Sequence, residues 1–151
     1  MKFIVTKELG KLARWLRILG FDTVYYDKAN YATLVIIALR DQRTIITRSK
    51  KEIDKLPQNS LLIISEDILE QIKEVIEKLK LRIDEEKMFS RCTICNEFLI
   101  EVKKDKIKDL VPEYVYNHQD FFMQCPQCRR IYWQGSHWGN VTKIINNLGL
   151  K

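Results

Sequence analysis

The residues best suited to chemistry in this chain are its four cysteines, because they form two pairs with the spacing of a metal site. The pairs are Cys92-x-x-Cys95 and Cys125-x-x-Cys128, and 29 residues separate them. Two C-x-x-C turns can meet around one ion, and an all-thiolate tetrahedral site suits Zn(II). In a sequence without a secretory signal, this pairing favours a metal over disulfides. We therefore expect a structural zinc site at Cys92, Cys95, Cys125 and Cys128.

Other interpretations of these cysteines stay open. A rubredoxin-like iron site would make the protein an electron carrier, although no further cofactor motif accompanies it. His118 and His137 are further potential ligands, but four thiolates already close the site, so we expect stacked or hydrogen-bonded histidines. The segment that carries the cysteines has few apolar side chains, and the metal is expected to supply folding energy that its small core lacks.

The elements that must position this site follow from the apolar periodicity of the first eighty residues. Short runs that are apolar on both faces alternate with segments of helical spacing, which indicates a parallel sheet covered on both sides. We expect an α/β domain over residues 1–83, a linker at 84–87, and a zinc-ribbon domain over 88–151 with a C-terminal helix. The expected strands are 2–6, 22–26, 44–47 and 60–65; the expected helices are 7–19, 30–40, 50–56, 67–79, a short one within 109–118, and 141–148.

The charge balance favours an anionic partner. The chain has a net charge of +6, and the excess lies in residues 1–51 (+7) and 88–151 (+3), with −4 between them. Such a distribution is typical of nucleic-acid binding, although a lysine-rich surface alone can also produce it. No apolar run is long enough for a membrane span, and no glycine-rich phosphate loop predicts a nucleotide cofactor. We expect a cytoplasmic protein that uses neither.

The first helix carries a candidate RNA-binding face. Its apolar residues form one stripe, and cations occupy the other side, with Trp15 between them. Cations can contact phosphates while an aromatic ring stacks on a base. The alternative is a solvated face, with Trp15 half-buried against the second domain. The expected nucleic-acid contacts are Lys7, Lys11, Arg14, Trp15, Arg17, Arg48, Lys50 and Lys51.

Several motifs resemble one known family. The run from Phe3 to Asp22 resembles the opening of the PIN-like ribonuclease domain at the C-terminus of the mutator-seven exonuclease proteins. Further similar motifs are Ile45-Ile-Thr-Arg48, Arg91-Cys-x-x-Cys-Asn96, Cys125-Pro-x-Cys128 and Ile131-Tyr-Trp-x-Gly-Ser-His-Trp138. The resemblance covers almost the whole chain. It implies a PIN-like three-layer α/β/α sandwich, a C-terminal four-cysteine zinc ribbon, and RNA as the substrate class.

The sequence departs from the family where catalysis needs acids. PIN-type nucleases gather carboxylates at the strand C-termini to hold Mg(II) or Mn(II). The family pattern has Asp where this chain has Thr6 and Ser49, and an acidic start to the second helix where it has 31–33, Tyr-Ala-Thr. A neutral hydroxyl is a weak ligand for a hard dication. Asp22 and Asp27 match the pattern, but only Asp27 follows a strand, and its other interpretation is a turn residue.

We therefore expect an RNA-binding relative of PIN-like ribonucleases that is catalytically impaired and associates with RNA or a ribonucleoprotein, such as the ribosome. One alternative is an active Mg/Mn-dependent ribonuclease with Asp27 as the principal ligand. The other is a protein-interaction module that uses the aromatic cluster at Tyr132, Trp133, His137 and Trp138. In that cluster the rings can instead clamp the ribbon onto the first domain.

Overall fold

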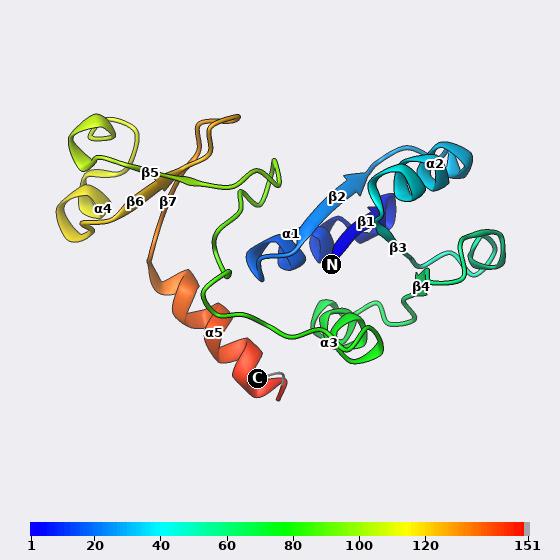
Figure 1. The fold of residues 1–151 in the computed structure, drawn as a ribbon. Coiled ribbons are helices and arrows are strands. Elements are labelled where there is room, and N and C mark those ends of the chain that lie inside the picture. Colours follow the sequence, from blue (N-terminus) through cyan, green and yellow to red (C-terminus); the bar gives the residue numbers. More distant parts are fainter. Residues whose placement is uncertain (150–151) are drawn as a thin grey trace.

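The computed structural model describes residues 1–149, and for residues 136–138 it describes the backbone alone. The chain forms an α/β domain followed by a small antiparallel ribbon (Figure 1). The elements in chain order are β1 (Lys2–Thr6), the 3-10 turn η1 (Lys7–Leu9), α1 (Gly10–Ile18), β2 (Asp22–Tyr26), α2 (Tyr31–Asp41), β3 (Thr44–Thr47), η2 (Ile53–Lys55), β4 (Leu61–Leu62), α3 (Ile68–Lys78), β5 (Ile100–Val102), η3 (Lys104–Lys106), α4 (Glu113–His118), β6 (Phe122–Gln124), β7 (Ile131–Trp133) and α5 (Ser136–Asn147).

The α/β domain is built on a four-stranded parallel sheet of order β2-β1-β3-β4. Thr6, the last residue of β1, pairs with Tyr26, the last residue of β2. Because all the strands run the same way, their C-terminal ends meet at one edge of the sheet, where parallel α/β folds place their functional groups. Residues 60–65 were expected to form a full strand, but only Leu61 and Leu62 pair with β3.

Helices cover both faces of the sheet, so the expected three-layer α/β/α sandwich is confirmed. Alternating side chains of β1 separate the two cores: Phe3 and Val5 pack with α1 and α3, whereas Ile4 packs with α2. All three side chains are fully buried. In Figure 1, α1 and α3 lie away from α2 across the strands.

Local signals begin and end these helices. Asn30 and Asp67 cap α2 and α3, because their side chains accept the backbone N–H groups of Thr33 and Glu70 at 3.1 Å each. Gly20 follows α1 with a φ of +95°, and a Cβ there would lie 2.6 Å from the backbone oxygen of Lys87. This glycine therefore lets the segment before the ribbon pass close to the end of α1.

The ribbon is a three-stranded antiparallel sheet of order β5-β6-β7. The short helix expected within 109–118 is present as α4. Ile107, Val111 and Phe122 form the buried core of this unit beside α4, and the core is small. The fold of the ribbon therefore depends on a further constraint, which the cysteines are placed to provide.

The C-terminal helix differs from its expected assignment to the ribbon. Val141 and Ile145 of α5 are buried in the main core of the α/β domain, together with residues of α1 and α3. The chain thus crosses from the α/β domain to the ribbon and returns (Figure 1). None of the helices in the described part of the chain combines the length and apolar character that crossing a bilayer requires.

Candidate metal centre and nucleic-acid interface

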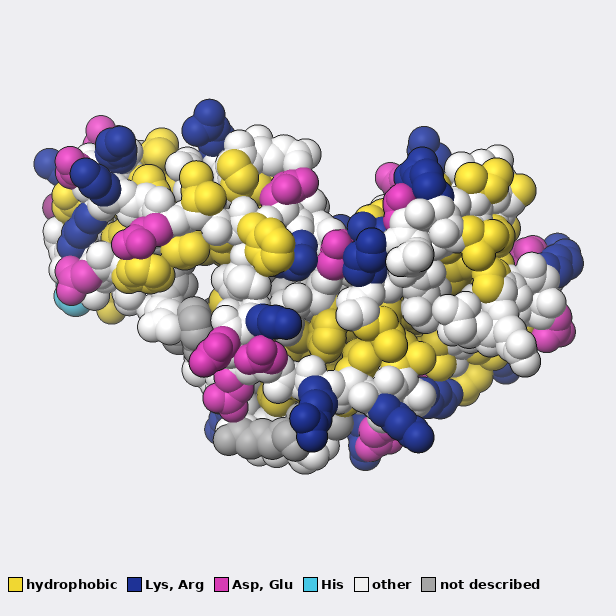
Figure 2. All heavy atoms as spheres, viewed as in Figure 1, with side chains coloured by type: hydrophobic (Ala, Val, Ile, Leu, Met, Phe, Trp, Pro, Cys, Tyr) yellow, Lys and Arg dark blue, Asp and Glu magenta, His cyan; other side chains and the backbone are white. Residues whose placement is uncertain are grey.

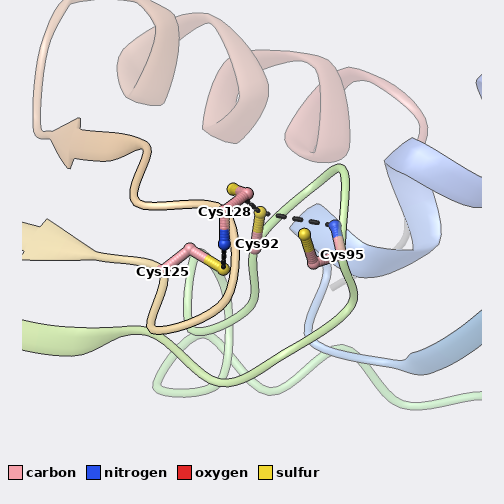
Figure 3. A group of neighbouring side chains, drawn as sticks. All are labelled: Cys92, Cys95, Cys125 and Cys128. Atoms are coloured by element: carbon pink, nitrogen blue, oxygen red, sulfur yellow. Dashed lines mark hydrogen bonds between the residues drawn. The ribbon is translucent and has the colours of Figure 1, made fainter.

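The four cysteines converge from two loops that share one geometry. Their sulfur atoms all lie within 4.8 Å of one another, and the Sγ atoms of Cys92 and Cys128 are 3.7 Å apart. Sulfurs bound at about 2.3 Å to one tetrahedral ion would be about 3.8 Å apart, so the spacing fits a metal. Within each loop, the N–H of the second cysteine donates to the sulfur of the first at 3.4 Å (Figure 3). These four residues could hold a metal ion such as zinc.

The protonation of the thiols also favours a cation between them. Burial raises the pKa of Cys92, but the Tyr132 hydroxyl at 3.1 Å and two backbone N–H groups outweigh it, so this pKa falls to about 7. Burial and the neighbouring cysteines Cys128 and Cys125 raise the pKa of Cys95 to about 12. Four sulfurs this close cannot all ionise without a compensating charge, and a dication supplies it.

The first cysteine knuckle, residues 92–97, is fastened to the α/β domain. Asn96 is the central contact: its Oδ1 accepts the N–H of Thr23 at 3.0 Å, and its Nδ2 donates to Asp22 at 2.7 Å. Asp22 also forms an ion pair with Arg43 at 2.7 Å. Burial opposes ionisation of Asp22, but the bonds from Arg43 and Asn96 outweigh it and lower its pKa. Asp22 is thus committed to holding the ribbon in place.

Arg17 completes this contact, and its position corrects the expectation that it faces RNA. Its side chain is 7% exposed. The guanidinium donates to the carbonyl of Thr23 at 2.9 Å and to those of Thr93 and Ile94 at 2.8 and 3.1 Å. Burial lowers the pKa of Arg17, and the negative charge of the neighbouring thiolates opposes that shift. Arg17 therefore joins α1 to the knuckle, and its Nε and Nη1 donors are engaged by protein carbonyls.

At the C-terminal edge of the sheet, a single carboxylate is surrounded by hydroxyl and amide donors. The Oε1 atom of Glu8 accepts the hydroxyl of Thr6 at 2.6 Å, the backbone N–H of Arg48 at 2.9 Å and the hydroxyl of Thr47 at 3.3 Å. Thr6 and Thr47 are buried, and their hydroxyl oxygens are 3.1 Å apart. Burial raises the pKa of Glu8, but these three donors outweigh it and leave that pKa below its usual value.

Ser49 and the start of α2 are also neutral here, whereas Asp27 and Asp22 keep the acids that the family pattern expects. Ser49 lies beside Thr47, whose hydroxyl oxygen accepts the Ser49 N–H at 3.1 Å, and the Tyr31 hydroxyl is 3.4 Å from the same oxygen. Asp27 is exposed and directly follows Tyr26, which places it at this edge, as expected. Asp22 is at the start of β2, roughly 13 Å away along the strand. In the part of the chain that the structure describes, three or more potential metal ligands come together only at the cysteines.

The cations expected to contact RNA from the first helix include both exposed and buried side chains. Lys7 on η1, and Lys11 and Arg14 on α1, are exposed as expected. Trp15 is partly buried and packs against the main core, to which α5 contributes. Trp15 is thus half-buried, as the alternative expected, but the core against which it packs is that of the α/β domain and not of the ribbon. Arg17, one turn further along α1, is buried.

The cations after β3 also differ in exposure and in their contacts. Lys50 and Lys51 are exposed, whereas Arg48 donates to the carbonyl of Ile64 at 3.4 Å and lies 3.8 Å from the Glu66 carboxylate. Figure 2 shows one face of the molecule, on which basic and acidic side chains lie interspersed rather than in one patch. A positive surface for RNA is therefore indicated by the exposed cations beside the first knuckle and not by the overall charge.

The RNA contacts expected from the sequence did not include two further exposed cations. Arg129 and Arg130 directly follow Cys128 and are exposed, and they line a cavity together with Trp133. The signal in the sequence was a pair of adjacent arginines after the second C-x-x-C. His118 is exposed; its ring nitrogen lies 2.8 Å from the Tyr114 carbonyl and its ring faces that of Tyr114, as expected for a histidine that binds no metal. The side chains of His137 and Trp138 lie outside the described residues.

Together, the parallel sheet with helices on both faces and the four-cysteine ribbon define a three-layer α/β domain joined to a potential metal-binding ribbon. Residues 1–145 match the family model described as the Mut7-C RNAse domain. The chain therefore belongs to this family, as its motifs predicted. The same comparisons give no match among curated proteins and none among solved structures.

The contrast between Arg14 and Arg17 gives a test of the knuckle contact. We expect Arg17→Ala to lower the free energy of unfolding by about 2–4 kcal/mol, because it leaves the buried carbonyl of Thr23 and two carbonyls of the knuckle without their donor. Arg14→Ala removes the same charge from the same helix at an exposed position and should change stability by less than about 0.5 kcal/mol. Urea denaturation of both variants measures the difference. Equal losses would contradict the structural role of Arg17.

Proposed function

We propose that this protein binds RNA and does not cleave it. The observation that carries the proposal is the network around Glu8: this carboxylate accepts the hydroxyls of Thr6 and Thr47, and Thr6 stands at the sheet edge where the family pattern has an acid. Metal-assisted hydrolysis of a phosphodiester requires anionic oxygens that hold a hard dication beside the scissile phosphate. Here one carboxylate is engaged by three donors, and the neighbouring hydroxyls contribute no charge to such a site.

Binding is supported by the same substitutions. Removing carboxylates from the sheet edge also removes repulsion toward RNA phosphates, while Lys7, Lys11 and Arg14 stay exposed nearby on η1 and α1. Lys50 and Lys51 add positive charge after β3. The family supplies RNA as the class of partner. A structured ribonucleoprotein such as the ribosome is the partner that we favour, by analogy with other small basic zinc-ribbon proteins.

The ribbon has a structural part in this proposal. A zinc ion held by Cys92, Cys95, Cys125 and Cys128 would fix two loops whose own core is small, and would keep the first knuckle in the shape that contacts α1.

Loss of one thiol should therefore release the metal and unfold the ribbon. We expect the unaltered protein to contain one zinc per chain and Cys92→Ser to contain none, as measured by elemental analysis. Circular dichroism should show that most helix is retained, because α1, α2 and α3 pack on the parallel sheet. Cys92→Ser that stays fully folded without metal would contradict the structural role.

The lack of a catalytic metal site is tested with Mn(II). Titration calorimetry of the zinc-loaded protein should show no saturable Mn(II) binding from micromolar to millimolar concentration, and no Mn-dependent cleavage of RNA. The double variant Thr6→Asp, Ser49→Asp should gain Mn(II) affinity, since it restores two anionic ligands beside Glu8. If the unaltered protein binds Mn(II), and Asp27→Asn abolishes both that binding and RNA cleavage, the nuclease is active and the proposal fails.

RNA binding itself is tested by its salt dependence. The affinity for a labelled RNA should fall as KCl rises, and Lys11→Ala, Arg14→Ala should weaken binding and reduce the slope of log K against log salt by about 1.4. Lys103→Ala, Lys106→Ala is the matched control, because both lysines are exposed on the ribbon. It should bind RNA almost as the unaltered protein does. An RNA affinity that does not change with salt would contradict phosphate binding.

A further inference from the structure

We propose that the second cysteine knuckle, residues 125–130, completes a binding track for single-stranded RNA. In this track, Arg129 and Arg130 contact phosphates and Trp133 stacks on a base. The inference rests on the proposed RNA-binding function and adds to it a second contact site on the ribbon and a preference for unpaired strands.

The two cysteine knuckles have the same backbone geometry. In the first, the N–H of Cys92 donates to the carbonyl of Glu97 at 2.8 Å, and the N–H of Asn96 to the carbonyl of Cys92 at 2.9 Å. The corresponding bonds of the second, each 3.0 Å long, run from Cys125 to Arg130 and from Arg129 to Cys125. Asn96 and Arg129 have φ angles of 66° and 67°. Arg129 is thus the structural counterpart of Asn96, and Arg130 that of Glu97.

The two knuckles nevertheless make different contacts. Asn96 is occupied with Thr23 and Asp22, so the first knuckle is committed to the α/β domain. Arg129 and Arg130 are exposed. An asparagine adopts a positive φ more readily than an arginine does, so the backbone alone does not account for an arginine at position 129. At the positions where the first knuckle contacts the α/β domain, the second knuckle therefore presents two exposed arginines, which form a basic surface.

This basic surface adjoins the exposed cations of α1. Lys11, Arg14 and Tyr25 line a cavity of about 430 Å³, and Arg129, Arg130 and Trp133 line another of about 590 Å³. Both cavities are also lined by Thr93 and Ile94, so both adjoin one short stretch of the first knuckle. Each cavity combines two exposed cations with one exposed aromatic ring. We call these six residues the basic track: Lys11, Arg14, Tyr25, Arg129, Arg130 and Trp133.

The charges of the track are available to a ligand. Among the described residues, the side-chain ion pairs engage other cations: Arg40, Arg43, Arg48, Lys55, Lys78 and Lys104. The acidic residues of the ribbon do not line either cavity. Four cations that form no ion pair with the described residues complement a chain of phosphates.

The aromatic rings of the track are exposed and held in place. Tyr25 is 37% exposed, and its hydroxyl donates to the backbone carbonyl of Lys7. Trp133 is 36% exposed and packs edge-on against the buried Phe122, with the ring centres 6.4 Å apart. A ring that is fixed on one side and open on the other suits base stacking. Since bases in a duplex already stack on each other, this arrangement favours single strands.

The geometry of the first knuckle supplies a variant that should fold. Arg129→Asn, Arg130→Glu gives the second knuckle the residues that the first carries at the equivalent positions, in the same backbone conformation. The full-length, zinc-loaded variant is titrated against labelled single-stranded oligoadenylate and oligouridylate, and against a duplex RNA of the same length. We expect its affinity for single strands to fall at least 10-fold, with a salt slope lower by about 1.4.

A matched control separates the local effect from net charge. Lys80→Asn, Arg82→Glu changes the charge equally, and Lys80 also has a positive φ, of 51°. Both residues are exposed, and neither lines the two cavities. This control should lower the affinity less than threefold. Trp133→Leu should lower the affinity for single strands about 5- to 100-fold with an unchanged salt slope, since it removes stacking and no charge.

The outcomes distinguish the inference from the function on which it rests. If the Arg129→Asn, Arg130→Glu variant binds like the control while Lys11→Ala, Arg14→Ala loses affinity, RNA binding stands and the second knuckle is not part of the site. Equal or tighter binding of duplex RNA overturns the preference for single strands. If the unaltered protein binds none of these RNAs, both proposals fail, and the exposed arginines then belong to a protein contact.

Discussion

The contact between Arg17 and the first cysteine knuckle is the constraint on which the arrangement of this molecule depends. A buried guanidinium is costly unless every donor finds an acceptor. Arg17 offsets part of this cost with bonds from Nε and Nη1 to one carbonyl of β2 and two of the knuckle, more than seventy residues further along the chain. Those two carbonyls have the right positions only while the knuckle keeps its turn. The geometry of the cysteine site is thereby coupled to the packing of α1, and so to the core beneath it.

A second connection makes this coupling stronger. Asn96 adopts a positive φ within the knuckle and uses its side chain to join Asp22 and Thr23 at the start of β2. Meanwhile α5 returns from the ribbon and buries Val141 and Ile145 beside α1 and α3. The ribbon is therefore attached at both of its ends. This arrangement explains why a unit with so small a core can present cavities of fixed shape next to the α/β domain.

Much of the fold and part of the site could be predicted from the sequence, for identifiable reasons. Alternating apolar runs specify a parallel sheet, and the capping residues Asn30 and Asp67 mark helix starts, because these are local effects. The cysteine spacing predicts a metal site because two C-x-x-C turns supply the four thiolates of one tetrahedral ion. Arg17 could not be assigned correctly, because helical periodicity places it near the exposed side while its acceptors are distant in sequence. Likewise, the sequence placed the terminal helix with the ribbon, because nothing local reveals which core its apolar face joins.

On the function that we propose, a few substitutions at the sheet edge change what this fold can do. Clustered carboxylates repel each other and are tolerated because a bound dication compensates them, so such an edge is incomplete without its metal. With Thr6 at the position of a family acid and Thr47 beside it, two hydroxyls and a backbone N–H donate to Oε1 of Glu8. The pKa of Glu8 stays low for that reason. On the proposed function, an edge that needs no metal also repels phosphates less. The same fold then favours holding RNA, and its cations define where the strand lies.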